Sequence, residues 1–88
     1  MIAFEVRLNG QRLCTAGHAD ISVLSALINH VSRRRDLLFS VSGLTQGAKG
    51  PSQHLDWLNF SRLSVGDEIS IKIADVPRCD APKDVRTI

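Results

Sequence analysis

The residue types for a metal site or a nucleophile are present in one set of three histidines, two cysteines and one aspartate: His18, His30, His54, Cys14, Cys79 and Asp56. A structural zinc site needs four such ligands to converge, and only His54 and Asp56 are close in the sequence. A neighbouring imidazole could convert Cys14 into a reactive thiolate, yet Cys14 lies in a hydrophobic segment that is typical of a core. We therefore predict no metal, no cofactor and no catalytic residue, with a reactive cysteine as an alternative.

The glycine-rich stretch around Lys49 resembles a phosphate-binding loop only loosely. That loop requires a glycine immediately before the lysine and a serine or threonine immediately after it. Here Ala48 precedes Lys49 and Gly50 follows it. The composition of this stretch indicates a surface loop without nucleotide chemistry.

Two groups of arginines are the candidate binding residues. Arg7 and Arg12 are expected to lie opposite each other on a hairpin, where like charges cost stability unless an acidic group lies between them. Arg33, Arg34 and Arg35 offer planar guanidinium groups suited to carboxylates or phosphates. The net charge is only +2, which favours local recognition of an acidic protein surface over general attraction to nucleic acid. A nucleic-acid-binding module that uses these arginines is the alternative.

The two ends of the sequence supply the clearest structural elements. Residues 2–8 alternate in the manner of a half-buried strand and lead into Asn9-Gly10, a strong hairpin signal. In the register that we expect, Val6 faces Leu13, and both lie in the core. Residues 69–73 alternate in the same way after a Gly-Asp turn, and shorter strand patterns lie at 37–41 and 54–57.

Residues 20–34 are ambiguous between a helix and a strand. Apolar residues recur at helical spacing and Asp20 suits an N-cap, whereas many of the side chains are β-branched. Periodicity favours the helix. We therefore predict an α+β fold, in which a four- to five-stranded, mainly antiparallel sheet carries one helix on one face. The alternative is a small all-β sandwich with residues 23–32 as a strand.

The order of these elements resembles the β-grasp arrangement of ubiquitin-like proteins, with Gly66-Asp67-Glu68 leading into the closing strand. The chain ends in Arg86-Thr87-Ile88, without the Gly-Gly terminus that conjugated members use. Several short segments also resemble stand-alone bacterial proteins of unassigned function, namely 12–17, 23–26, 41–44 and 63–68. The second resemblance implies no activity.

Size and composition complete the prediction. A chain of 88 residues with 43% hydrophobic and 23% charged residues is sufficient for one domain, placed at 1–76, with 77–88 as a flexible tail. We see no export leader and no apolar run of about 20 residues, so we expect no membrane contact and a cytoplasmic location. The predicted function is a small intracellular, non-catalytic protein-binding module of the accessory, inhibitor or immunity type, whose partner is another, acidic protein. The oligomeric state is left open.

Overall fold

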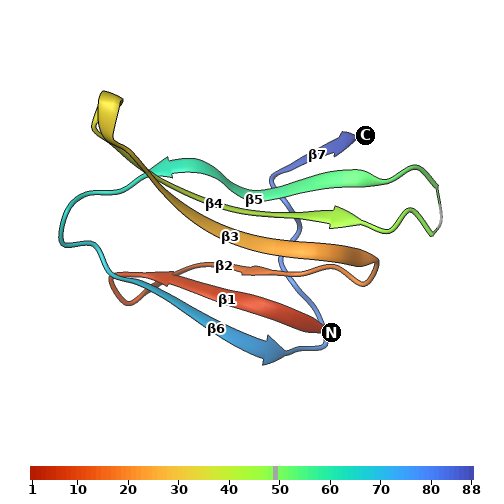
Figure 1. Cartoon of the computed structure of the whole chain (residues 1–88). Helices are drawn as coiled ribbons and strands as arrows, with labels where there is room; N and C mark the ends of the chain where they lie inside the picture. The colour runs from red at the N-terminus through yellow and green to blue at the C-terminus, as the bar shows by residue number, and fades with distance from the viewer. Residues whose placement is uncertain (49) are drawn as a thin grey trace.

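The structure is a computed structural model that describes residues 1–48 and 50–88, so that Lys49 of the glycine-rich loop lies outside the described residues. Two antiparallel sheets pack face to face (Figure 1). One sheet has the strand order β2-β1-β6 and the other has the order β3-β4-β5-β7. The strands are β1 (Ile2–Leu8), β2 (Gln11–Ala16), β3 (Ile21–Val31), β4 (Asp36–Thr45), β5 (Gln53–Arg62), β6 (Ile69–Asp75) and β7 (Asp84–Thr87).

The predicted α+β fold is therefore wrong, and no α-helix occurs in the part of the chain that the structure describes. The segment assigned to the helix is β3, which pairs with β4 from Ile21 to Val31. Its β-branched residues suit a strand, and β4 pairs with it along its whole length. The periodicity of one segment contains no information about such a pairing partner. The alternative of an all-β sandwich describes the structure, and the helix of a β-grasp fold is not found.

The first hairpin confirms the predicted turn. Asn9 and Gly10 have φ angles of 50° and 81°, as a two-residue turn with positive φ at both positions requires. Arg7 pairs with Arg12 as expected, but a bulge follows and Val6 pairs with Cys14. Cys14 is consequently the buried residue, and Leu13 is partly exposed.

The core lies between the sheets and is formed by side chains from both. Its largest fully buried members are Trp57, Phe39, Leu55, Val6 and Val41. Two irregularities in the pairing of β4 with β5 interrupt the alternation of β5 near Trp57 and Leu58. Both residues are buried as a result, which a strict two-residue period does not predict.

Residues 77–88, predicted as a flexible tail, cross from one sheet to the other and end in β7. Cys79 packs so closely on Gly17 that a Cβ atom added there would lie 2.6 Å from the Cys79 sulfur. The N–H of Asp80 donates to the carbonyl of Thr15 in β2 (2.9 Å), and the N–H of Lys83 donates to the carbonyl of Asp56 in β5 (2.8 Å). This C-terminal segment therefore connects the two sheets at one side of the sandwich.

Candidate protein interface

The structure places the two groups of arginines on different sheets. Arg12 already has a partner within the chain, because its Nη2 lies 2.7 Å from Asp80 Oδ2 and 2.9 Å from Thr15 Oγ1. The C-terminal segment thus supplies an acidic partner for Arg12, and within the described residues no ion pair involves Arg7. Arg7 is exposed on the outer face of the first sheet.

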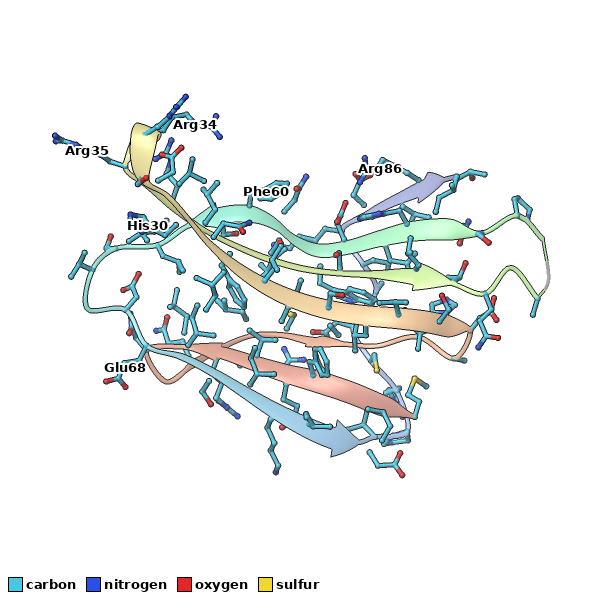
Figure 2. The ribbon with its side chains drawn as sticks, in the orientation of Figure 1. His30, Arg34, Arg35, Phe60, Glu68 and Arg86 are labelled. Carbon is cyan, nitrogen blue, oxygen red and sulfur yellow. The ribbon has the colours of Figure 1, made fainter. Side chains whose placement is uncertain are left out.

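Arg33, Arg34 and Arg35 form the turn between β3 and β4, at the far end of the second sheet (Figure 2). Ser32–Arg34 is a 3-10 turn, and Arg35 closes it with a left-handed φ of 54°. Arg34 Nε lies 3.7 Å from Asp36 Oδ2, and Arg62 Nη1 lies 2.8 Å from the other oxygen of the same carboxylate. Within the described residues, no ion pair involves Arg33 or Arg35.

His54, Asp56 and Arg86 form a polar cluster on the second sheet. His54 Nε2 lies 2.9 Å from Asp56 Oδ1, and Arg86 Nη2 lies 3.4 Å from Asp56 Oδ2. The buried carboxylate thereby joins β7 to β5. Among residues 1–48 and 50–88, no group of three or more His, Cys, Asp or Glu side chains could hold a metal ion. We assign this cluster to the cohesion of the sheet.

The two cysteines lack the surroundings of a nucleophile. Burial raises the pKa of the Cys14 thiol above its ordinary value, and the Asp80 carboxylate raises it further. Burial also raises the pKa of Cys79. A raised pKa leaves a thiol protonated at neutral pH, where the thiolate is the reactive form. This geometry gives a reactive-cysteine function no support.

The four edge strands offer backbone groups to which a partner could bind, and three of these edges are protected in the described structure. The edge of β2 is covered at Thr15, whose N–H donates to Asp80 Oδ2 (2.8 Å) and whose carbonyl accepts from the Asp80 N–H. The edge strand β6 carries Lys72 and Asp75, and the four-residue β7 carries Asp84 and Arg86. Charged side chains and short length are the usual protection of an edge.

The edge of β3 is different. It is eleven residues long, and between Ile21 and Val31 it contains no Lys, Arg, Asp or Glu. Its inner edge pairs with β4, and no strand of the described chain pairs with its outer edge. A long, uncharged edge of this kind exposes backbone N–H and C=O groups to any chain that can pair with them.

The side of the sandwich that carries β3 also exposes apolar side chains. Asp80 contacts β2 and Lys83, a few residues later, contacts β5, so that β2 lies near β5 and β7. At the opposite side of the sandwich, the other two edge strands, β6 and β3, therefore lie near each other. Ile28 of β3 and Ile69 of β6 line the same surface hollow accordingly. Ile28 is 57% exposed and Ile73 is 71% exposed, although Ile73 shares the inner face of its sheet with Phe4. We call the β3 edge, with Leu27, Ile28, Ile71 and Ile73, the open side.

Sequence reasoning missed the open side because it assigned residues 20–34 to a helix. The signal was present in the absence of charge from Ile21 to Val31. A strand of that composition is unusual at the edge of a sheet, where charged residues are common. From its composition, β3 would have been expected at the centre of a sheet.

Comparison of the chain with protein-family models, with curated proteins and with solved structures finds no match. A search of the described residues for a helix long and apolar enough to cross a bilayer also finds none. The function is therefore argued from the surface of the molecule.

Proposed function

We propose that this protein is a small, non-catalytic protein-binding module that binds an extended segment of its partner along β3. The observation that carries the proposal is the free, uncharged edge of this eleven-residue strand. Strand addition to an exposed edge is a general mode of recognition, in which backbone hydrogen bonds provide affinity and side-chain contacts provide specificity.

The apolar residues of the open side support the same proposal. A strand added beside β3 would extend the second sheet over β6. It would cover Ile28 and Ile73, which are otherwise exposed to water. Burial of apolar surface would then add to the hydrogen bonds at about 25 cal/mol per Å². The fold leaves uncovered the surface that such a partner would bury.

The arginines of the β3–β4 turn are included in the proposed interface. Arg33 and Arg35 lie where the β3 edge ends, and they would favour an acidic side chain on the bound segment. Arg7 remains a second candidate on the other sheet, whereas Arg12 is assigned mainly to the contact with Asp80. Carboxylates within the chain contact Arg12, Arg34, Arg62 and Arg86, which makes the nucleic-acid alternative the weaker proposal. We place the module in the cytoplasm, where the free thiols of Cys14 and Cys79 stay reduced.

Site-specific photo-crosslinking in the native cell tests this function. A photoreactive amino acid at Leu27, on the open side, should crosslink to protein, and the same amino acid at Val85 in β7 should not produce that product. Leu27→Lys should abolish the product obtained with the probe at Ser25, because an edge lysine opposes strand addition. Val85→Lys is the matched control, since the two side chains have similar exposed fractions, 51% and 46%. Crosslinking to nucleic acid at Leu27, or an unchanged product in the Leu27→Lys variant, would overturn the proposal.

A further inference from the structure

We propose that the segment bound along β3 is the β3 strand of a second copy of this chain, so that the protein forms a two-fold symmetric dimer. This inference rests on the proposed function and names its partner. The four-stranded sheets of the two copies would join through antiparallel β3 strands into one continuous sheet. An isologous interface of this kind closes on itself and leaves no free β3 edge.

The first argument is the pattern of charge along the edges. When a strand pairs with its own copy about a two-fold axis, like charges near the axis face each other and cost stability. Self-pairing of β6 about its middle would place Lys72 against Lys72 of the second copy. β3 has no acidic or basic residue apart from His30, near its end, and pays no such penalty. The strand whose edge is free is thus also the strand that tolerates its own copy.

The second argument is register. In a continuous sheet, residues that face the first sheet must pair with residues of the same face, and the pairing that uses the whole strand places the axis at Ala26. Leu24 then lies opposite Ile28 of the second copy, and Ala26 lies opposite Ala26. Both kinds of pair are apolar, so the inner face stays continuous at the centre of the interface.

The third argument is the uncovered apolar row of β6. The two-fold axis passes through the joined sheet, so that both three-stranded sheets lie on the same side of it, with their β6 strands next to each other. Ile71 and Ile73, which are exposed in the single chain, would lie beneath the joined β3 strands. The same operation therefore pairs the free edge and covers the exposed apolar residues.

Sedimentation equilibrium of the purified chain, from about 1 μM to 1 mM, tests the dimer. We expect a reversible transition to a species of twice the 9.7 kDa chain mass. Leu27→Lys should raise the dissociation constant about tenfold or more, because the two lysines become diagonal neighbours across the axis. Val85→Lys should leave it unchanged. A monomer over the whole range, an open polymer, or a dimer that is weakened only by Val85→Lys would overturn the inference.

Disulfide formation tests the register. Under mild oxidation Ala26→Cys should give a disulfide-linked dimer, because Ala26 lies opposite Ala26 of the second copy, whereas Asn29→Cys should not. Circular dichroism identifies any variant that fails to fold. A dimer that Asn29→Cys links and Ala26→Cys does not has a different register and refutes the proposed one. If the chain is monomeric while Leu27 still crosslinks to another protein in the cell, the dimer fails and the proposed function stands.

Discussion

Asp80 makes several polar contacts although it lies, only partly buried, on a connecting segment. Its carboxylate accepts hydrogen bonds from the N–H of Thr15 and from Arg12, and its carbonyl accepts from Trp57 Nε1 (2.8 Å). The bond from the Thr15 N–H, followed by the contact with Arg12, lowers the pKa of Asp80 below its ordinary value. One residue therefore attaches the C-terminal segment to β2 and to the core tryptophan.

The lowered pKa of Asp80 gives a pH-dependent prediction. Its contribution to stability is fully present above the unfolded-state pKa of about 3.9 and is lost as the pH falls through the lower, folded-state pKa. Asp80→Asn should reduce the free energy of unfolding near pH 7 by about 1 kcal/mol. Urea unfolding should show this difference shrinking below about pH 4. A difference that stays constant down to pH 2 would show that the charge of Asp80 does not contribute.

Phe60 gives a second prediction at this scale. It has a φ of 51° and is 56% exposed, on the outer side of the second sheet where Arg86 also lies (Figure 2). The left-handed region costs a residue with a Cβ about 1–2 kcal/mol relative to glycine. Phe60→Gly should therefore unfold at a higher urea concentration than Phe60→Ala, since both remove the same exposed ring. If the alanine variant is the more stable one, the strain is not present in solution.

At the scale of elements, the C-terminal segment is part of the folded structure. Its residues contribute β7, the contact of Cys79 with Gly17 and the hydrogen bond to Trp57. Deletion of residues 79–88 should lower the melting temperature by at least about 10 °C, because it exposes Trp57 and Leu55 and removes an edge strand. Deletion of residues 84–88 alone should have an intermediate effect, and deletion of Ile88 a small one. Equal melting temperatures for all four chains would show that this segment is detached in solution.

The sequence was sufficient for elements whose signals are local. The Asn9-Gly10 turn and the alternation of residues 2–8 and 69–73 identify β1, β2 and β6, and the Arg7–Arg12 pairing follows from the turn. The bulge that buries Cys14 in place of Leu13 has no signal in the neighbouring sequence. β3 was assigned to a helix because apolar spacing can fit both periods, and only pairing with β4 decides between them.

The candidate site was less predictable than the fold for a related reason. Arginines can be located in a sequence, but their partners cannot. The binding of Arg12 to Asp80 depends on a chain crossing that joins two sheets. A free edge is a property of the strand order, so the open side emerges only when all seven strands are placed.

At the scale of the whole molecule, the two sheets should differ in local stability. β1 is paired on both sides by β2 and β6, whereas within the described residues β3 is paired by β4 alone. In the monomeric Leu27→Lys variant, hydrogen exchange should therefore be faster along β3 than along β1. In the wild-type chain, protection of β3 should increase with protein concentration. Equal exchange rates for β1 and β3 in the variant would contradict a free β3 edge.

The position of β1 at the centre of its sheet also bears on how the chain folds during its synthesis. Val6 emerges from the ribosome well before its partner Ile71. The first sheet cannot close until β6 has emerged, while β3 and β4, adjacent in the sequence, can already form their hairpin. Nascent chains on neighbouring ribosomes would then present β3 hairpins before the core exists. The same edge that we assign to dimer formation is thus also a surface by which two unfinished chains could meet.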